Sequence, residues 1–355
     1  MDRHGEIVVL GLIGKKSSSL LGVDIGSASV KLLELSRSGQ GFRVEAYAVE
    51  ALPSGAVIEQ RIVELEVVGA ALSRALIKST STQRCAAAAV AGSAVISKRI
   101  EMPADLDDEA LERQVRVEAA QYVPYPLEDV ALDFAVQGPF PGNPQRVEVL
   151  LAACRIEHVE AREAVLGLAG LTARLVDIET LALERSCHLL LQSLPGAAEL
   201  RTVGLLDIGA STMTLSVLRH GRVIYSREQV TGGFQRTQSA LEAVPQGPLL
   251  ASLPGDCSQV VLQPYEAELL QQASRALQLF AESLESHPLD CLLLAGDSAV
   301  LQGLAPLVEV QLGVQVRVAD PFVGMSMGGR VDAEALQRDA SGLLIACGLA
   351  LRGFE

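Results

Sequence analysis

The chain is poor in aromatic and in basic residues. Trp is absent, and aromatic residues make up only 3% of the 355 residues, whereas apolar residues make up 49%. The core must therefore be built from Leu, Val, Ile and Ala, as in sheets that are covered by helices. The 29 basic residues are outnumbered by 43 acidic residues, which gives a formal charge of −14. This balance argues against nucleic-acid binding, which requires clustered Lys and Arg, and against direct adhesion to an anionic membrane.

Paired cysteines and long apolar runs are also missing. The six cysteines include no Cys-x-x-Cys pair and mostly lie in apolar runs, so we interpret them as buried free thiols in a reducing compartment. No cleavable signal is apparent, and no apolar stretch approaches the roughly 20 residues that span a bilayer. The sequence therefore predicts a cytoplasmic protein without direct membrane insertion.

The length of the chain favours two lobes rather than one core. We expect a flexible leader over 1–19, a first lobe over 20–198 and a second lobe over 199–355. The first lobe is predicted to contain an inserted subdomain at about 94–171. The second lobe is predicted to contain a shortened small subdomain at about 232–270 and a C-terminal helix at 340–352 that packs back at the lobe interface.

Hydrophobic periodicity and turn residues predict the elements of both parts of the first lobe. Outside the insert, we expect strands at 20–25, 29–36, 42–50, 85–91 and 173–178, and helices at 61–78 and 179–191, the first with Val63, Val67, Ala70, Ala71 and Arg74 at helical spacing. In the insert, a strand at 96–102 precedes an αββα unit with strands at 130–137 and 146–153 and a last helix near 157–169. Its first helix is predicted to be capped by Asp105 and to carry Leu111, Val115 and Tyr122 on one face.

The opening pattern of the chain occurs twice. The segment Val23–Leu32, which contains Asp24-Ile25-Gly26-Ser27, is matched by Leu206–Leu215, which contains Asp207-Ile208-Gly209-Ala210. Each copy continues through a second strand and a Gly turn into a third strand. The repeated strand and turn order, half a chain apart, indicates a duplicated α/β domain.

The two Asp-Ile-Gly turns are candidates for a phosphate site. A Gly bend lets backbone N–H groups approach a ligand, and nearby hydroxyls add hydrogen-bond donors for phosphate oxygens. Asp24 and Asp207 would repel phosphate unless they orient the water shell of a Mg²⁺ ion. One copy alone would be an ordinary hairpin turn. The candidate cofactor-binding residues are Asp24, Gly26, Ser27, Ser29, Lys31, Asp207, Gly209, Ser211, Thr212, Gly232, Gly233, Gly296 and Asp297.

Gly296 and Asp297 belong to a third element. Leu292-Leu293-Leu294-Ala295 is a buried strand that ends in Gly296, before a helix through Leu301 and Leu304. A strand-to-helix turn beside a cleft suits contact with adenosine or ribose. The same pattern alone is common in α/β proteins.

These elements, in this order, resemble the superfamily of actins, heat-shock chaperones and sugar kinases over most of the chain. The resemblance implies an actin-like, ribonuclease H-like fold that binds ATP with Mg²⁺, with the hairpins on the phosphates. Ala340–Ala350 is similar to the small-residue interdomain helix of that superfamily. Glu179 lies where bacterial actins carry the Glu that positions the attacking water, and it is our candidate catalytic residue. A helix-start Glu favoured by the helix dipole is an equally good interpretation.

A narrower resemblance covers nearly the whole chain. The segments Leu21–Gly26, Ile100–Pro103, Glu118–Val130, Asp133-Phe134, Leu150–Arg155 and Cys347–Arg352 resemble the type IV pilus assembly protein PilM family, which is related to the cell-division protein FtsA. The resemblance implies a cytoplasmic adaptor at the inner-membrane face in pilus biogenesis and twitching motility. It also implies binding to the cytoplasmic N-terminal segment of the membrane protein PilN and contact with other pilus components, including cytoplasmic motors. Self-association is left open.

The partner site is predicted at the groove between the first lobe and the insert. The cytosolic end of a membrane anchor tends to be basic, and an acidic protein would attract it; the same acidic surface is also an ordinary means of solubility. The candidate partner-binding residues are Met102, Pro103, Tyr122, Pro124, Tyr125 and Phe134. The aromatic residues among them fit the core of the insert equally well.

Three departures from the family pattern leave the chemistry open. Asp297 follows Gly296 where relatives have a second Gly, and Ala210 follows Gly209. A Pro- and Gly-rich stretch around 242–256 replaces the helical, lysine-bearing element that holds the ribose and base in relatives. An ATP-binding adaptor is favoured, because a clear general base is lacking. An ATPase that uses Glu179 and a nucleotide-free scaffold are the alternatives.

Overall fold

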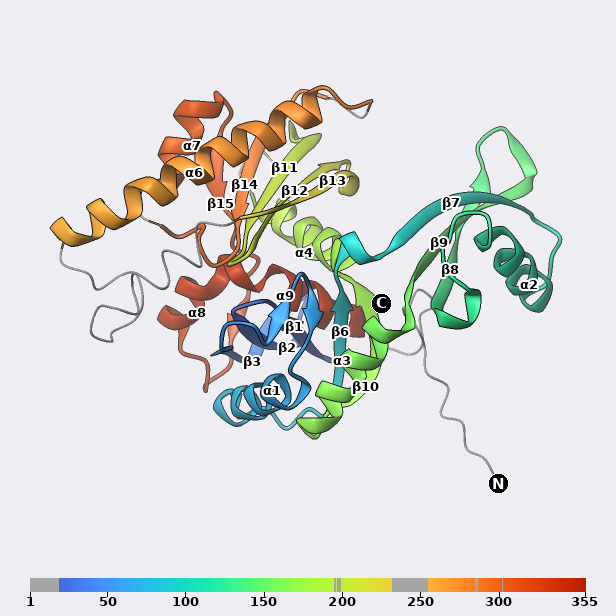
Figure 1. Ribbon diagram of the computed structural model, residues 1–355, viewed down its shortest axis with the longest axis horizontal. Coiled ribbons are helices and arrows are strands. Elements are labelled where there is room, and N and C mark those ends of the chain that lie inside the picture. Colours follow the sequence, from blue (N-terminus) through green and yellow to red (C-terminus); the bar gives the residue numbers. More distant parts are fainter. Residues whose placement is uncertain (1–18, 195, 197–198, 232–254, 285–286, 302) are drawn as a thin grey trace.

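Two α/β lobes and a projecting insert make up the structure (Figure 1). The computed structural model describes residues 19–194, 196, 199–231, 255–284, 287–301 and 303–355. Within these residues, the five cysteines whose side chains are described are free thiols; four of them are buried, as the sequence predicts, whereas Cys85 is partly exposed. No helix of the described part is both long and apolar enough to cross a membrane.

The first-lobe sheet has six strands in the order β10-β6-β1-β2-β3-β16. An antiparallel meander comes first, formed by β1 (Leu21–Ile25), β2 (Ser29–Ser38) and β3 (Gly41–Ala51). On the other side of β1, β6 (Cys85–Val90) and β10 (Thr172–Ile178) run parallel to it. The last strand, β16 (Ser326–Met327), comes from the C-terminal part of the chain and pairs with β3.

The second-lobe sheet repeats this arrangement. Its order is β13-β12-β11-β14-β15, formed by β11 (Thr202–Ile208), β12 (Thr212–Arg219), β13 (Arg222–Val230), β14 (Cys291–Ala295) and β15 (Val316–Val318). As in the first lobe, three strands form a meander and two more run parallel to its first strand. The duplication and the actin-like fold predicted from the repeated Asp-Ile-Gly segment are confirmed.

Helices cover both faces of the two sheets. α1 (Leu65–Ser79) and α3 (Ile156–Leu168) cover the outer face of the first sheet, and α6 (Gly255–Ala281) and α7 (Leu304–Leu312) cover that of the second. Between the sheets lie α4 (Glu179–Ser193) and α9 (Leu344–Leu351), whose apolar residues pack on both lobes. α8 (Ala333–Asp339) and a 3-10 turn, Ala340–Leu343, precede α9.

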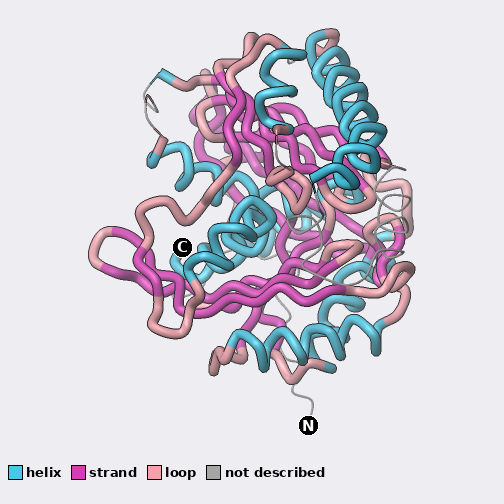
Figure 2. The backbone as a smooth tube through the Cα atoms, turned by 90° about the vertical axis from the view of Figure 1, so that its left-hand side faces the viewer, coloured by secondary structure: helices cyan, strands magenta, loops and turns pink. Residues whose placement is uncertain are grey.

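The insert projects from the side of the first lobe in Figure 1 and lies on the far side of the molecule in the turned view of Figure 2. Its sheet has the order β7-β9-β8, formed by β7 (Ile96–Pro103), β8 (Val130–Phe140) and β9 (Asn143–Arg155). α2 (Asp108–Ala119) packs on this sheet through Leu111, Val115 and Ala119. The order α2, β8, β9, α3 is the predicted αββα unit, but α3 returns to the first lobe and packs against α1.

Two details of the first lobe correct the prediction from sequence. The first helix begins at Leu65 rather than at 61, because Val57–Ile58 (β4) and Arg61–Ile62 (β5) form a hairpin. The apolar face of this helix is also displaced along the chain, to Val68, Ala71, Leu72, Ala75 and Leu76. Val63, which was expected on that face, is 53% exposed. The hairpin occupies the residues that a helix from 61 would have used for its first turn.

In the insert, the helix cap and one aromatic residue differ from the prediction. The cap is Asp107, whose carboxylate accepts a hydrogen bond from the backbone N–H of Ala110 at 2.8 Å, rather than Asp105. Since α2 ends at Ala119, Tyr122 does not share its apolar face and is 39% exposed. In the second lobe, the helix that was predicted to run through Leu301 and Leu304 begins only at Leu304.

The C-terminal part of the chain packs against the first lobe. α9 contacts β1 at a very short distance, since a Cβ atom at Gly22 would overlap the carbonyl oxygen of Ala346. On its other side, a Cβ atom at Gly348 would overlap the carbonyl oxygen of Ala182 in α4. These two glycines therefore allow the helix to fit between the lobes.

Candidate functional site

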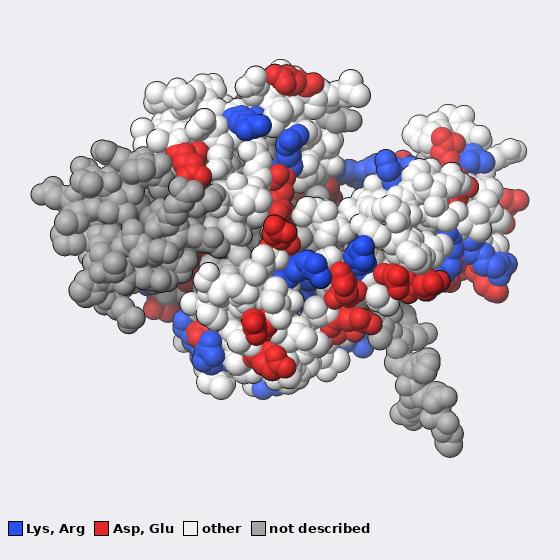
Figure 3. Space-filling model, viewed as in Figure 1, with Lys and Arg blue, Asp and Glu red and all other residues white. Residues whose placement is uncertain are grey.

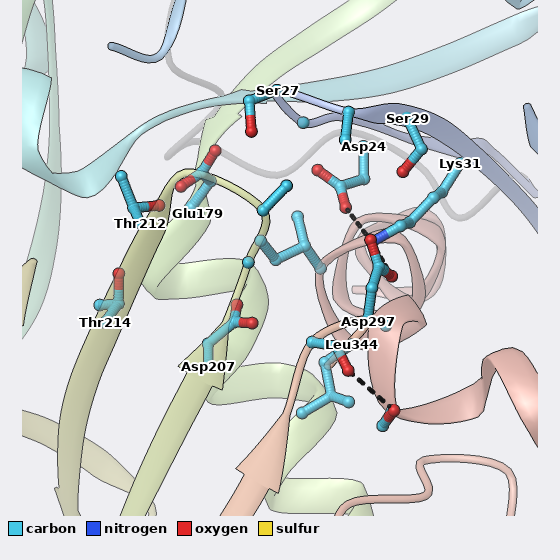
Figure 4. A pocket seen from close by; sticks show the side chains of 18 of the residues that line it. Asp24, Ser27, Ser29, Lys31, Glu179, Asp207, Thr212, Thr214, Asp297 and Leu344 are labelled. Atoms are coloured by element: carbon cyan, nitrogen blue, oxygen red, sulfur yellow. Dashed lines mark hydrogen bonds and ion pairs between the residues drawn. The ribbon is translucent and has the colours of Figure 1, made fainter. Parts of the chain in front are cut away.

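The two Asp-Ile-Gly turns face one another across the cleft between the lobes (Figure 4). Each turn is closed by a 2.9 Å hydrogen bond, from the N–H of Gly26 to the oxygen of Ser29 and from the N–H of Gly209 to the oxygen of Thr212. The Ser211 hydroxyl also donates to the Ser27 hydroxyl at 2.9 Å, so the lobes touch directly. Hydroxyls from both lobes are thus concentrated where the turns meet.

Most of the predicted cofactor residues line this cleft. They are Asp24, Gly26, Ser27, Ser29, Lys31, Asp207, Gly209, Thr212, Gly296 and Asp297, together with the candidate catalytic Glu179. Ser211 contacts the cleft through Ser27. The predicted residues Gly232 and Gly233 lie outside the described residues.

Three polar residues and one glycine of the cleft were missed from the sequence: Gln60, Thr214, Ser341 and Gly342. Thr214 could have been found, because it pairs with Asp207 across its hairpin in the same way that Lys31 pairs with Asp24. Gln60 lies in a segment that no motif indicated. Ser341 and Gly342 belong to Ala340–Ala350, which was expected to form the interdomain helix and was not predicted to line the cleft.

Lys31 is the one cation among the residues that line the cleft in the described structure. Its Nζ lies 2.9 Å from Asp297 and 3.9 Å from Asp24, so it joins a first-lobe strand to the end of a second-lobe strand (Figure 4). Burial would lower the pKa of Lys31, but the two carboxylates outweigh this effect and raise it. The lysine therefore stays charged and is already paired.

The carboxyl groups of the cleft are not balanced by enough positive charge nearby. Burial is the main cause that raises the pKa of Asp24, that of Asp207 to about 6 and that of Glu179 to about 8. Asp24 adds to the effect on Glu179, whereas Arg162 opposes it. A free triphosphate would meet this negative field, while a magnesium-bound nucleotide would relieve it.

The donor set of the cleft fits a phosphate chain with a hydrated Mg²⁺ ion. In the described part of the chain, no cluster of three or more His, Cys, Asp or Glu side chains could hold a metal by itself. Mg²⁺ bound to nucleotide takes most of its ligands from phosphates and water, and one or two carboxylates suffice to orient it. Asp24 and Asp207 are the carboxylates at the second-to-last position of β1 and β11, directly before the two turns.

The turn after β14 is held tightly against the C-terminal segment. Gly296 has a φ of 88°, and a Cβ atom there would overlap the carbonyl oxygen of Ile208. Its N–H donates to the oxygen of Ser341 at 2.8 Å, and the Ser341 hydroxyl donates back to the oxygen of Gly296 at 3.0 Å. The turn therefore requires glycine at this position.

A second cavity lies between the insert and the first lobe. Its lining comes from the loop before β7, the turn before β8, the end of β9 and the start of α3: Ser93, Ala94, Ile96, Val123, Tyr125, Ala153, Cys154, Arg155 and His158. The guanidinium of Arg155 stacks 4.1 Å from the centre of the Tyr125 ring. We call this cavity the partner groove.

The structure brings only part of the predicted partner set to the partner groove. Tyr125 lines it, whereas Met102 is 1% exposed and Phe134 packs on the core of the insert. Tyr122 lies outside the groove, with the Nζ of Lys98 6.0 Å from its ring. Pro103 ends β7 and Pro124 is exposed before Tyr125.

The duplicated sheets, the interlobe helices and the paired turns define an actin-like protein with an insert in its first lobe. The chain belongs to the type IV pilus assembly protein PilM family, whose model matches residues 22–354. A chain of the PilM-PilN type IV pilus biogenesis complex is 28% identical, with 96% of this chain and 99% of that chain covered and a TM-score of 0.74.

Two more distant structures share the fold alone. The ethanolamine utilization protein EutJ from Carboxydothermus hydrogenoformans is 16% identical, with 96% of this chain and 92% of that chain covered and a TM-score of 0.52. A nucleotide-free diol dehydratase-reactivating factor is 10% identical, with 94% and 99% covered and a TM-score of 0.50.

Proposed function

We propose that this chain is a nucleotide-binding adaptor of the type IV pilus inner-membrane complex, and that it holds the cytoplasmic N-terminal segment of PilN. The observation that carries the proposal is the similarity, over nearly the full length of both chains, to a chain of the PilM-PilN complex. In this role the protein is cytoplasmic and reaches the inner-membrane face through its partner. Its further partners are other pilus proteins, including the cytoplasmic motors.

The partner groove is the site proposed for the PilN segment. Ile96, Val123 and Tyr125 offer apolar contacts, and a groove of this kind suits one or two anchoring side chains of a peptide. On the face seen in Figure 3, acidic side chains gather near the junction of the first lobe and the insert, with basic side chains beside them. Together with the net charge of −14, they attract the basic residues expected at the cytosolic end of a membrane anchor.

The cleft between the lobes is the site proposed for Mg-ATP. The hydroxyls of Ser27, Ser29 and Thr212 are placed to donate to phosphate oxygens, and Asp24 and Asp207 to orient the water shell of Mg²⁺. A phosphate chain bound beside Ser27 would lie next to the Ser27–Ser211 contact between the lobes. A nucleotide that binds one arrangement of the lobes more tightly than another would shift the population between them.

The adaptor is favoured over an efficient ATPase. A general base must be ionised at the working pH, but the pKa of Glu179 is raised to about 8 in the nucleotide-free cleft. In the nucleotide-free cleft the protonated form of Glu179 is therefore favoured, and a protonated carboxyl cannot accept a proton from water. ATP binding without rapid hydrolysis is therefore the expected activity.

A peptide titration tests the partner site. A synthetic peptide of the PilN N-terminus should bind by calorimetry, and more weakly at high salt because charges contribute. Tyr125→Ala should weaken binding about tenfold, which is about 1.4 kcal/mol. Tyr122→Ala is the matched control, since Tyr122 lies on the insert outside the groove. A peptide that fails to bind with or without Mg-ATP would sink the adaptor proposal.

A nucleotide titration tests the cleft. Asp24→Ala should lower the affinity for Mg-ATP, since it removes one of the two carboxylates placed to orient the ion. Asp105→Ala, an exposed position of the insert, should leave the affinity unchanged. If the unmodified protein binds no ATP up to millimolar concentration, only the nucleotide-free scaffold remains.

A further inference from the structure

The hairpin of β4 and β5 has an unusual turn. Its two central residues, Glu59 and Gln60, have φ values of 47° and 63°. Turns with two positive φ angles normally use Asn, Asp or Gly, and other residues there cost of order 1 kcal/mol each. Strain of this kind is kept where the backbone position serves a purpose, so the contacts of Gln60 are informative.

Gln60 reaches across the cleft to the opposite lobe. Its side chain lines the same cleft as the two Asp-Ile-Gly turns, and its Nε2 lies 3.5 Å from the hydroxyl of Thr212. The amide NH₂ carries two hydrogen-bond donors and no charge. In a cleft whose one lysine is already paired with carboxylates, these donors are suited to a phosphate oxygen.

Arg162 of α3 fixes the backbone of this hairpin. Its side chain is buried, with the residue 2% exposed, and its guanidinium donates to three backbone carbonyls. Nε donates to Ala89 at 2.7 Å, Nη1 to His158 at 3.1 Å and Nη2 to Gln60 at 3.2 Å. One rigid, planar group therefore joins the end of β6, the start of α3 and the tip of the hairpin.

The start of α3 also forms one wall of the partner groove. Cys154, Arg155 and His158 line that groove, and β9 of the insert runs directly into α3 at Arg155. A second contact joins the hairpin to α3, an ion pair of 3.5 Å between Arg61 and Glu157. A shift of α3 caused by a peptide in the groove would therefore reach the hairpin chiefly through the buried Arg162, since an exposed ion pair contributes little.

We infer that Gln60 positions the terminal phosphate of a nucleoside triphosphate, and that Arg162 couples this contact to the partner groove. The inference rests on the proposed function, since it needs both ligands to bind. Coupling between two sites is reciprocal, so Mg-ATP should change the affinity for the peptide by the same factor by which the peptide changes the affinity for Mg-ATP. We expect a factor of about 5 to 10, at the lower end of the common range.

The Gln60→Gly variant distinguishes the role of the Gln60 side chain in binding from the effect of the strained backbone on stability. Glycine accepts a positive φ, so the nucleotide-free variant should unfold at the same temperature as the unmodified protein or a higher one. Its affinity for Mg-ATP should fall about tenfold, whereas its affinity for Mg-ADP should not change, because the terminal phosphate is absent. Glu59→Gly is the matched control: it relieves the same strain at an exposed side chain and should bind both nucleotides normally.

The Arg162→Lys variant tests the coupling between the nucleotide cleft and the partner groove. Lysine keeps the charge but cannot donate to three carbonyls at once. Both ligands should still bind, but the affinity of the peptide should no longer depend on Mg-ATP. Arg74→Lys, which changes an exposed ion pair with Glu50, should leave the coupling intact. If Arg162→Lys does not fold, the peptide titrations of Gln60→Gly decide, since this variant should also lose the dependence on Mg-ATP.

The outcomes distinguish this inference from the proposed function. If the unmodified protein binds neither ligand, both fail. If it binds both, but Gln60→Gly keeps the full affinity for Mg-ATP and the full coupling, the inference is overturned while the adaptor proposal stands. Independent binding of the two ligands to the unmodified protein would overturn it as well.

Discussion

At the scale of single residues, the charge balance around Lys31 governs the cleft. Asp297, which belongs to the opposite lobe, forms an ion pair of 2.9 Å with Lys31. Gly342 leaves room for this pair, since a Cβ atom at position 342 would overlap the carboxylate of Asp297. The lysine is thus partly neutralised before any ligand arrives. The sequence indicated Asp297 as a departure from the family pattern, and the structure adds its partner.

Asp297→Asn should strengthen the binding of Mg-ATP. The change removes one negative charge from the phosphate cleft and frees Lys31, so we expect the affinity to rise about tenfold, or about 1.4 kcal/mol, by calorimetry. Glu66→Gln, which removes an exposed charge from the first turn of α1, is the control and should have no effect. Weaker binding by Asp297→Asn would mean that Asp297 itself contributes to the site.

Glu179 should make the stability of the nucleotide-free protein depend on pH. Its pKa is about 8 in the folded protein against an ordinary value of 4.5, so the folded state binds the proton more tightly than the unfolded state. The free energy of unfolding therefore falls as the pH rises from about 4.5 through about 8. Glu179→Gln removes this loss. The unfolding temperature of Glu179→Gln minus that of the unmodified protein should therefore increase by about 2 °C or more from pH 5 to pH 9.

Asp290 provides a control of opposite sign. Hydrogen bonds from the N–H groups of Thr202 and Arg201 hold the pKa of Asp290 below its ordinary value, so its contribution is complete above about pH 4. Asp290→Asn should therefore be less stable than the unmodified protein by a constant amount between pH 5 and pH 9. A constant difference for Glu179→Gln as well would contradict the raised pKa.

At the scale of elements, the sequence predicted most strands and helices because their apolar patterns are regular. The meanders and the two parallel strands after them follow from buried runs that end in Gly or polar turns, and the duplication fixed their order. The β4–β5 hairpin was missed because Glu59 and Gln60 are not turn-forming residues. The cap of α2 was placed two residues early because Asp105 and Asp107 are chemically equivalent, and only the path of the chain selects between them.

The candidate site was predictable where the repeat or the superfamily resemblance indicated it. Most residues of the two turns, together with Gly296 and Glu179, line the cleft as expected. Gln60 and Arg162 were missed, because their contacts join segments far apart in the sequence. Met102 and Tyr122 show the same limit for the partner site. A single chain does not reveal which apolar residues face a groove and which face a core.

The packing of α9 depends on glycine at position 348. A methyl group there would overlap the carbonyl oxygen of Ala182, so Gly348→Ala must push α9 away from α4. We expect a loss of about 1 to 3 kcal/mol in the free energy of unfolding, measured by denaturant titration. Gly167→Ala in α3 is the control, because nothing lies within 4 Å of its Cβ position and alanine favours a helix. An equal effect of the two changes would show that α9 is not tightly packed.

At the scale of the whole molecule, the first lobe is built from both ends of the chain. Leu33, Leu35 and Val44 of its sheet are covered by Phe322, Leu336 and the helix α9. The lobes therefore share a core with the C-terminal segment, in addition to the polar contacts across the cleft.

A chain that ends at Ala319 should not fold cooperatively. It lacks β16, α8 and α9, so one apolar face of the first sheet is left open to water. We expect no sharp thermal transition by circular dichroism and association on size-exclusion chromatography. Removal of Glu355 alone, which loses ion pairs with Arg185 and Arg352, should cost less than about 1 kcal/mol. A soluble, cooperative fragment would contradict the shared core.

This dependence on the last helix also has a consequence for synthesis on the ribosome. The meander of the first lobe is complete at Ala51, but the helix that covers its inner face ends at Leu351. At the usual rate of about 5 to 20 residues per second, translation of the intervening chain takes roughly 15 to 60 s. During that time the nascent first lobe exposes an apolar face, so we expect ribosome-associated chaperones to bind it until the chain is released.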